Sequence, residues 1–403
     1  MRNTYRHRTY RIISRGWIVA IAIMLLSAGQ TALAQIRPDV SCTFTLGSSG
    51  QTFGPAGGMG GFSVTTQNTC NWTAMTNNNW INITSGAGIG SGNVSFTVAV
   101  NLTALPRTGT ITVSDQTYTV TQRADQSKAT DFDADAKADV AVFRPSNGTW
   151  YILNSTNGST GVIGWGTTGD QVATGDFDGD GKADVTVWRP SNGTWYIRNS
   201  SNGALVVVGW GTSGDIPVPG DYDGDNKADE AVWRPSTGQW LINGSNGSQS
   251  TVVWGATGDV PAPGDFDGDG KIDVAVFRPS NGTWYIINSS NGSTSVVGWG
   301  TTGDQVVVGD YDGDGKADVA IFRPSNSTWY IRNSSNGALV VVGWGQSGDI
   351  PVPSDYDGDG KTDVAVWRPS TAQWLINGSL SGSTTVIWGA SGDVPVPSAP
   401  VRP

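Results

Sequence analysis

The chain has 403 residues, of which 37% are hydrophobic and only 14% are charged, and it contains 56 glycines and 18 tryptophans. Many turn residues combined with large aromatic side chains are typical of an all-β protein, and the aromatic side chains exclude a disordered chain without a core. The formal net charge is −10. Phosphate neutralisation needs a basic patch, so we expect no nucleic-acid partner.

The N-terminus has the pattern of a secretory signal peptide. Five arginines precede the apolar run Trp17–Leu26, and Ala32-Leu33-Ala34 follows it. A basic region, a short apolar core and a small-residue site predict a signal peptide over residues 1–34, cleaved after Ala34. The run is too short for a membrane span of about 20 residues. We therefore expect no membrane span after cleavage, with an uncleaved anchor as the alternative.

Cleavage would leave 19 basic and 34 acidic residues, a net charge of −15, and would remove the only histidine, His7. Two cysteines remain, Cys42 and Cys70. In an exported protein, which meets an oxidising environment, they predict a disulfide bond; two buried thiols are the alternative.

Residues 35–123 predict a β-sandwich of immunoglobulin size. Alternating runs such as Val94–Val98 and Thr110–Val113 are separated by clusters of Gly, Asn and Ser. Period-two alternation with frequent turn residues is typical of such a sandwich. The polar segment Ala124–Thr130 is the predicted linker to a second domain, over residues 124–403.

The order Cys42, Cys70-Asn-Trp72, Trp80-Ile81, Arg107–Val113 and Tyr118–Gln122 resembles the BACON family of bacterial secreted modules. The resemblance covers about 80 residues. It implies either a module that binds carbohydrate or mucin, or a spacer. We expect Trp72 and Trp80 to lie in the core and not to be exposed stacking platforms.

From residue 131 onward a nine-residue aspartate motif recurs six times, at spacings of 45, 45, 44, 45 and 45 residues. A fixed period of this length indicates a solenoid, a propeller or an array. Each unit contains short apolar runs joined by tight turns, which predicts four strands, the content of one propeller blade.

The repeat has an internal duplication. Arg189–Val218 and Arg323–Val352 differ at two positions, and the same offset of 134 residues relates the other units pairwise. This predicts a six-bladed β-propeller made of a triplet duplicated once. Asp393–Pro397 copies the entry strand Asp349–Pro353, so we expect the C-terminal strand to complete the first blade and close the ring, which removes exposed sheet edges. An open array is the alternative.

Each aspartate motif predicts a calcium site. In the second loop Asp176, Asp178 and Asp180 alternate with small or turn residues, and the carbonyl of Lys182 and the carboxylate of Asp184 complete a shell of oxygens. Ca²⁺ takes six to eight oxygen ligands in tolerant geometry, and carboxylates this close would otherwise repel or take up protons. The predicted ligands, with each lysine acting through its backbone carbonyl, are Asp131, Asp133, Asp135, Lys137, Asp139, Asp176, Asp178, Asp180, Lys182, Asp184, Asp221, Asp223, Asp225, Lys227, Asp229, Asp265, Asp267, Asp269, Lys271, Asp273, Asp310, Asp312, Asp314, Lys316, Asp318, Asp355, Asp357, Asp359, Lys361 and Asp363.

The loops predict about six Ca²⁺ ions, one for each blade, held with unequal affinity. The first loop has Ala134 and Ala136 where glycine is usual, so it should bind most weakly. The third loop has Asn226 at the turn position and Glu230 just after the motif. Glu230 is interpreted as a solvated acid, with a role as a further ligand as the alternative.

A strand, the motif D-x-D-G-D-G-K-x-D and a second strand, repeated over residues 131–397, resemble the FG-GAP or VCBS-type repeats of integrin α-subunits and of many secreted bacterial proteins. The resemblance implies a β-propeller with a calcium ion in the first hairpin loop of each blade. The predicted blade number departs from that of the integrin propeller.

Every unit also contains an arginine before a Pro turn and two tryptophans. Repetition in every blade favours packing, with tryptophan wedged between sheets and arginine paired with an acid or stacked on an aromatic ring. The alternative is a ring of inter-blade pockets in which sugars stack. The residues are Arg144, Arg189, Arg234, Arg278, Arg323 and Arg368, then Trp150, Trp195, Trp240, Trp284, Trp329 and Trp374, and then Trp165, Trp210, Trp254, Trp299, Trp344 and Trp388.

Catalysis finds little support, since the mature chain would have no histidine and a single glutamate, and we assign every repeated aspartate to a cage. We expect a monomeric protein, not an enzyme, at the cell surface or secreted, with the bacterial periplasm also possible. Its expected role is calcium-stabilised binding or adhesion to a surface glycan or extracellular protein. The alternatives are a structural surface or matrix protein without a specific ligand, and a polysaccharide-active enzyme.

Overall fold

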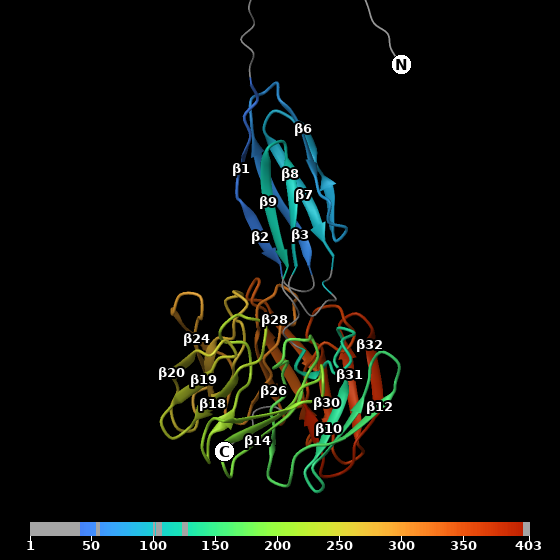
Figure 1. Ribbon diagram of the computed structural model, residues 1–403, viewed down its shortest axis with the longest axis vertical. Helices are drawn as coiled ribbons and strands as arrows, with labels where there is room; N and C mark the ends of the chain where they lie inside the picture. The colour runs from blue at the N-terminus through green and yellow to red at the C-terminus, as the bar shows by residue number, and fades with distance from the viewer. Residues whose placement is uncertain (1–40, 54–56, 100, 102–106, 123–127, 398–403) are drawn as a thin grey trace, which may run out of the picture. The chain divides into compact units, whose positions relative to one another are not determined.

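The computed structural model describes residues 41–53, 57–99, 101, 107–122 and 128–397. The predicted signal peptide and most of the predicted linker lie outside these residues. The described elements are β-strands and one three-residue 3₁₀ helix, η1 (Lys128–Thr130), so the all-β prediction is confirmed (Figure 1). In this part of the chain, no helix has the length and apolar character needed to cross a membrane.

Residues 42–122 form two sheets. One has the order β1-β3-β7-β5 and the other β2-β9-β8-β4-β6. The strands are β1 (Thr45–Leu46), β2 (Gly50–Phe53), β3 (Gly58–Thr65), β4 (Asn71–Met75), β5 (Ile81–Ser85), β6 (Ala87–Ile89), β7 (Gly92–Val98), β8 (Arg107–Val113) and β9 (Gln116–Gln122).

The sandwich core follows from alternation along these strands, because successive side chains point to opposite faces. In β7, Val94, Phe96 and Val98 are buried while their neighbours are not. Trp72 is buried and its Nε1 donates to the Gly90 carbonyl at 2.7 Å. Trp80 is half-buried, with the Arg107 guanidinium 4.5 Å from its ring centre. Neither indole is therefore a bare stacking platform. A disulfide bond joins Cys42 and Cys70.

Residues 128–397 form six four-stranded sheets, one for each repeat. The sheet orders are β12-β11-β10-β33, β13-β14-β15-β16, β17-β18-β19-β20, β21-β22-β23-β24, β25-β26-β27-β28 and β29-β30-β31-β32. In the first sheet the C-terminal strand β33 (Val394–Val396) pairs with β10, and Val142 lies opposite Pro395. The first sheet therefore joins the two ends of the repeat region.

The other strands of the six sheets follow one another along the chain, with an aspartate loop before the second strand of each sheet. Their bounds are β10 (Val140–Arg144), β11 (Thr149–Leu153), β12 (Thr160–Gly164), β13 (Gln171–Val172), β14 (Val185–Arg189), β15 (Thr194–Arg198), β16 (Leu205–Gly209), β17 (Ile216–Pro217), β18 (Glu230–Arg234), β19 (Gln239–Asn243), β20 (Gln249–Val253), β21 (Val260–Pro261), β22 (Val274–Arg278), β23 (Thr283–Ile287), β24 (Thr294–Gly298), β25 (Gln305–Val306), β26 (Val319–Arg323), β27 (Thr328–Arg332), β28 (Leu339–Gly343), β29 (Ile350–Pro351), β30 (Val364–Arg368), β31 (Gln373–Gly378) and β32 (Gly382–Ile387).

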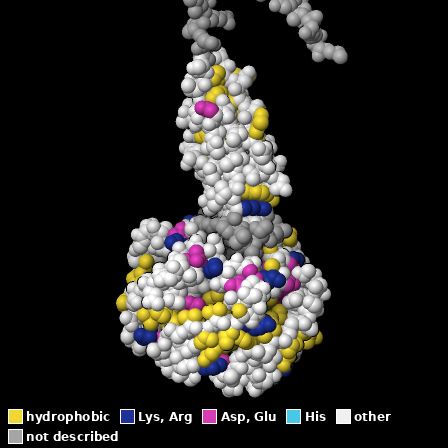
Figure 2. Space-filling model, in the orientation of Figure 1, with side chains coloured by type: hydrophobic (Ala, Val, Ile, Leu, Met, Phe, Trp, Pro, Cys, Tyr) yellow, Lys and Arg dark blue, Asp and Glu magenta, His cyan; other side chains and the backbone are white. Residues whose placement is uncertain are grey.

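Burial falls from the second strand of each sheet outward. In β14 four consecutive residues are buried, in β15 buried and half-buried residues alternate, and β16 is mostly exposed. Leu205 and Leu339 of the outermost strands are 58% and 57% exposed. Figure 2 shows hydrophobic side chains gathered over the repeat region. The sheets therefore bury their inner strands on both faces and leave their outer edges in solvent.

The tryptophans pack between neighbouring sheets. Trp195 is fully buried, and its Nε1 donates to the Trp210 carbonyl at 3.0 Å. Trp210 in turn donates to the Leu241 carbonyl of the next sheet at 3.0 Å. The last sheet reaches the first in the same way, since Trp388 Nε1 donates to the Tyr151 carbonyl at 3.0 Å. These indoles satisfy their N–H groups inside the packing, which accounts for the presence of tryptophan in every repeat.

The repeated arginines form bidentate ion pairs with a second set of repeated aspartates. Arg189 donates through Nε to Asp170 Oδ1 at 2.7 Å and through Nη2 to Oδ2 at 2.9 Å. The Asp170 side chain is 1% exposed. The prediction that every repeated aspartate belongs to a cage is wrong, because these six lie just before the entry strands and hold an arginine instead: Asp170, Asp215, Asp259, Asp304, Asp349 and Asp393.

Replacement of Arg189 by alanine should lower the free energy of unfolding by about 3–5 kcal/mol, because it leaves the buried Asp170 carboxylate without its partner. Asp170→Asn in the Arg189→Ala background should recover much of this loss, since it removes the uncompensated charge. Chemical denaturation measures all three. Arg198→Ala removes an arginine that has no ion pair with any described residue; it is the control and should change little. Equal small losses for both arginines would contradict the structural role of the pair.

Candidate metal centres

Each aspartate loop directly precedes the second strand of its sheet along the chain and folds around its first carboxylate. In the second loop Asp176 Oδ1 accepts from the Gly179 N–H at 2.6 Å and Oδ2 from the Gly181 N–H at 2.8 Å. An antiparallel bridge between Gly175 and Asp184 closes the base of the loop. The same two bonds from the third and fifth following residues occur in all six loops.

The last carboxylate ties the loop to the following hairpin. Asp184 Oδ2 accepts from the Phe177 N–H at 2.8 Å, and Oδ1 accepts from the Ser200 N–H at 2.6 Å. Asp178 and Asp180 lie toward solvent and accept from the hydroxyls of Ser201 and Ser200. The four carboxylates are therefore fixed by donors from two turns of one sheet.

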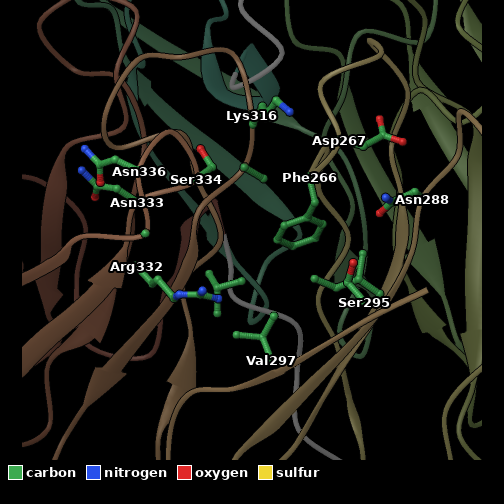
Figure 3. A pocket seen from close by; sticks show the side chains of 14 residues that line it. Phe266, Asp267, Asn288, Ser295, Val297, Lys316, Arg332, Asn333, Ser334 and Asn336 are labelled. Carbon is green, nitrogen blue, oxygen red and sulfur yellow. The ribbon is translucent and has the colours of Figure 1, made fainter. Parts of the chain in front are cut away.

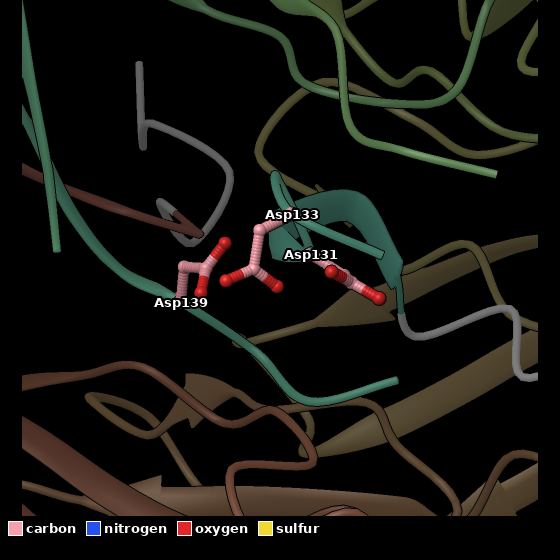
Figure 4. Close-up of side chains that lie close together, drawn as sticks. All are labelled: Asp131, Asp133 and Asp139. Atoms are coloured by element: carbon pink, nitrogen blue, oxygen red, sulfur yellow. The ribbon is translucent and has the colours of Figure 1, made fainter. Parts of the chain in front are cut away.

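Oxygens of the cage carboxylates converge. In five loops three carboxylates each offer an oxygen that lies within 4.8 Å of the others. In Figure 4, Asp133 lies between Asp131 and Asp139. The converging groups are Asp131, Asp133 and Asp139; Asp176, Asp178 and Asp180; Asp221, Asp223 and Asp225; Asp265, Asp267 and Asp269; and Asp310, Asp312 and Asp318. In all five of these loops the first and second predicted carboxylates converge. The third carboxylate joins them in three loops, and the last carboxylate joins them in the other two.

The donor set fits a hard cation. Oδ1 of Asp133 and Oδ1 of Asp357 are buried and have no hydrogen-bond partner. A buried anionic oxygen without a partner is costly, whereas a cation would satisfy it. The ligating atoms are all oxygens, which Ca²⁺ prefers in flexible sites.

Burial raises the pKa of several cage carboxyl groups. The pKa of Asp310 is raised to about 8 and that of Asp139 to about 7, in each case by loss of solvation first, with the charges of neighbouring aspartates adding to it. The pKa values of Asp184 and Asp318 are raised to about 6 for the same reasons. A cation in the cage would reverse this effect, because an opposite charge favours the ionised carboxylate.

Backbone hydrogen bonds connect each loop to the next one. The Ala183 N–H donates to the Asp131 carbonyl at 2.7 Å, so the second loop is bound to the first. The first loop is bound to the last through Ala138 and Asp355, at 2.6 Å. All six bonds have this form: Ala138–Asp355, Ala183–Asp131, Ala228–Asp176, Ile272–Asp221, Ala317–Asp265 and Thr362–Asp310. The loops are therefore linked in a closed cycle.

The unusual residues of the first and third loops take the same backbone shape as glycine. Ala134 and Ala136 have φ values of 65° and 70°, and Asn226 has 66°. An alanine in this region is strained, while asparagine tolerates it better. Glu230 is half-buried, and its Oε2 accepts from Nδ2 of its cross-strand partner Asn243 at 2.7 Å. Among the described residues it is outside the group of converging carboxylates in its loop.

The fold and loops define a repeat protein of the β-propeller class with an aspartate loop in each repeat. A family model described as FG-GAP-like repeat matches residues 131–187, 176–232, 221–276 and 265–321, and an FG-GAP repeat model matches residues 302–342. These matches together cover more than half of the chain, so it belongs to the FG-GAP repeat proteins. Residues 71–123 match BACON, described as a putative binding domain, so the chain also carries a BACON module.

Solved structures with similarity to this chain include a GH5 xyloglucanase of Bacteroides ovatus, at 19% identity and a TM-score of 0.19, over 26% of this chain. This chain covers 22% of that enzyme. Virginiamycin B lyase of Staphylococcus aureus has 12% identity and a TM-score of 0.40, over 64% of this chain and 83% of the lyase. A functionally unknown protein of Desulfotomaculum acetoxidans has 17% identity and a TM-score of 0.39, over 62% of this chain and 78% of that protein. Similarity this distant carries no information about activity. No curated protein matches this chain.

The double substitution Ala134→Gly and Ala136→Gly should raise the free energy of unfolding by about 1 kcal/mol, because relief of left-handed strain outweighs the greater flexibility of glycine in the unfolded chain. Denaturation in the presence and absence of Ca²⁺ measures it. The control is Ala138→Gly, in the same loop but without a positive φ, which should destabilise. A loss of stability in the double variant would contradict the assignment of strain to this loop.

Proposed function

We propose that this chain is an exported, calcium-stabilised binding or adhesion protein that recognises a surface glycan or an extracellular protein. The observation that carries the proposal is the closed cycle of loops with converging carboxylates. An array of this kind fixes a rigid framework, on which binding residues are held in place. The FG-GAP repeats and the BACON module both support a binding role.

In this proposal each loop holds one Ca²⁺ through its carboxylates and the carbonyl of its lysine. Bound calcium supplies positive charge that offsets the repulsion within each cage. Mg²⁺ is less suitable, because it demands near-octahedral geometry and retains its waters. The first loop, with its two strained alanines, is proposed to be the weakest site.

Export is supported by two separate features. The first 34 residues have the composition of a signal peptide. The disulfide between Cys42 and Cys70 is a bond that persists in oxidising compartments. We therefore propose a secreted or surface location, with the periplasm included.

Binding is favoured over catalysis by how the aspartates are used. We assign one set of repeated aspartates to the cages and the other set to ion pairs with the arginines. This leaves no pair of repeated carboxylates for general acid–base catalysis. The described residues contain no histidine. Figure 2 shows acidic and basic side chains interspersed on the visible face, unlike the basic surface that nucleic acid requires.

Removal of calcium should lower the melting temperature strongly. Each site at a hundred times its dissociation constant contributes about 2.7 kcal/mol, and several sites act together. Scanning calorimetry of the mature chain in Ca²⁺, in chelator and in chelator with excess Mg²⁺ measures this, together with the number of bound calcium ions. Mg²⁺ should restore little. An unchanged melt in chelator would refute the metal assignment.

The ligand class is tested by a glycan array and a panel of extracellular matrix proteins, both probed in saturating Ca²⁺. We expect selective binding to one of the two classes and its loss in chelator. Isolated residues 41–122 and 128–403 should be compared with the full chain, if each folds, to assign the binding module. No binding above background in either assay would favour a structural protein without a specific ligand.

A further inference from the structure

Two arginines differ from all the paired arginines of the repeat. Arg198 and Arg332 end β15 and β27, and both are half-buried. The described residues offer no ion pair or hydrogen bond to either guanidinium, although each of the six repeated arginines holds an aspartate. A half-buried cation with five unused donors is equipped to bind an anion.

Arg332 lines a cavity of about 540 Å³ between the fourth and fifth sheets of the repeat. This volume lies in the range of pockets that hold small molecules, about 300–1,000 Å³. Arg332, Asn333 and Asn336 lie on one side, and Phe266, Asn288 and Ser295 lie on the other, with the cavity between them (Figure 3).

The polar groups of this cavity suit a ligand with both a carboxylate and hydroxyl groups. Arg332 and Lys316 are its two cations, and the planar guanidinium matches a carboxylate. Asn333 Oδ1 is buried and without a hydrogen-bond partner, so it is available to accept from a hydroxyl. Asn288 and Ser295 add further polar groups.

An aromatic face completes the cavity. The Phe266 ring lies edge-on to Trp284, with 6.3 Å between ring centres, so a buried indole holds it in place. Sugars present apolar C–H faces beside their hydroxyl groups, and an aromatic side chain supplies a matching surface. The one acidic side chain in the lining, Asp267, is a cage carboxylate, whose charge the proposed calcium would offset.

The same residues recur 134 positions earlier, at the junction of the first and second sheets. The counterparts of Phe266, Asn288, Lys316, Arg332 and Asn333 are Phe132, Asn154, Lys182, Arg198 and Asn199. Ser295 is replaced there by Gly161, and Val297 by Ile163. In both junctions the guanidinium lies beside the glycine of the following turn, since a Cβ added to Gly203 would stand 3.5 Å from Arg198 Nη2 and one added to Gly337 would stand 3.9 Å from Arg332 Nη2.

The other four sheets have no arginine at this position. They carry Leu153, Asn243, Ile287 and Asn377, at the ends of β11, β19 and β23 and within β31. We propose that the two arginine junctions are a pair of equivalent binding sites for an acidic saccharide, whose carboxylate is held by Arg198 or Arg332. This assignment rests on the proposed binding function and names its ligand class.

Isothermal titration of the full mature chain in saturating Ca²⁺ tests the proposal. The probes are a glucuronate-bearing disaccharide, its neutral methyl ester and acetate. The acid should bind at two sites per chain. The ester should bind at least about 10-fold more weakly, since a hydrogen bond to a charged group contributes about 1.5–3 kcal/mol. Acetate should also bind more weakly than the acid, because it keeps the carboxylate but lacks the hydroxyl groups and the C–H face that would contact Asn333 and Phe266. Arg332→Gln and Arg198→Gln should each leave one site, and the double variant none.

Asn377→Gln is the matched control, at the same strand position in a sheet without arginine, and it should keep both sites. Melting temperatures should be the same in all variants, because the part of the chain that the structure describes gives neither arginine a structural partner. Undiminished binding of the acid by the double variant would overturn the proposal. Acetate binding as tight as that of the disaccharide would overturn the saccharide assignment, leaving only an anion site.

Glycan and matrix-protein arrays are probed in parallel with the native chain and with the double variant. Their comparison separates the proposal of the arginine sites from the proposed binding or adhesion function. Other ligands bound equally by both proteins would leave the binding function standing and refute the arginine sites. No ligand bound by the native chain would refute both.

Discussion

The first aspartate of each aspartate loop bonds in two directions, and the geometry of the repeat region depends on this residue. Its two carboxylate oxygens accept from N–H groups of its own loop, while its backbone carbonyl accepts from the following loop, as Asp131 does from Ala183 at 2.7 Å. A displacement of the carboxylate therefore moves the carbonyl on which the neighbouring loop rests. Since the cycle closes between Asp355 and Ala138, no loop is an end. The first aspartate thus links the cage of its own loop to the backbone of the neighbouring loop.

Local chemistry made the loops and strands predictable from the sequence. The aspartate motif fixes its own turn, and tryptophan at a constant period indicates packing wherever the repeat places it. The partner of the arginines was missed, because Arg189 and Asp170 are 19 residues apart and meet only when two strands pair. A signal existed: a Gly-Asp pair precedes every entry strand, and there is one such aspartate for each arginine. Counting those aspartates would have shown that the cages do not account for the whole repeated set.

The first aspartate loop has the backbone shape of the other loops although it lacks their glycines. Ala134 and Ala136 adopt φ values of 65° and 70°, close to those of glycine at the same places in the second loop, 81° and 88°. Both of their N–H groups donate to Asp131. The carboxylate thus imposes the turn, and the residue type decides only how much strain the turn carries. Sequence identifies the strain, but the hydrogen bonds that maintain it become visible only in the structure.

Differences among the repeats separate residues that build the framework from residues free to serve a ligand. The arginine–aspartate pair, the buried tryptophan and the first aspartate occur in all six units, so each has a structural task that every sheet requires. Arginine at the end of the third strand occurs in two units, and the remaining four form their sheets with leucine, asparagine or isoleucine there. Folding therefore does not require that guanidinium. A half-buried guanidinium that the framework does not use is available to bind a ligand that supplies an anion.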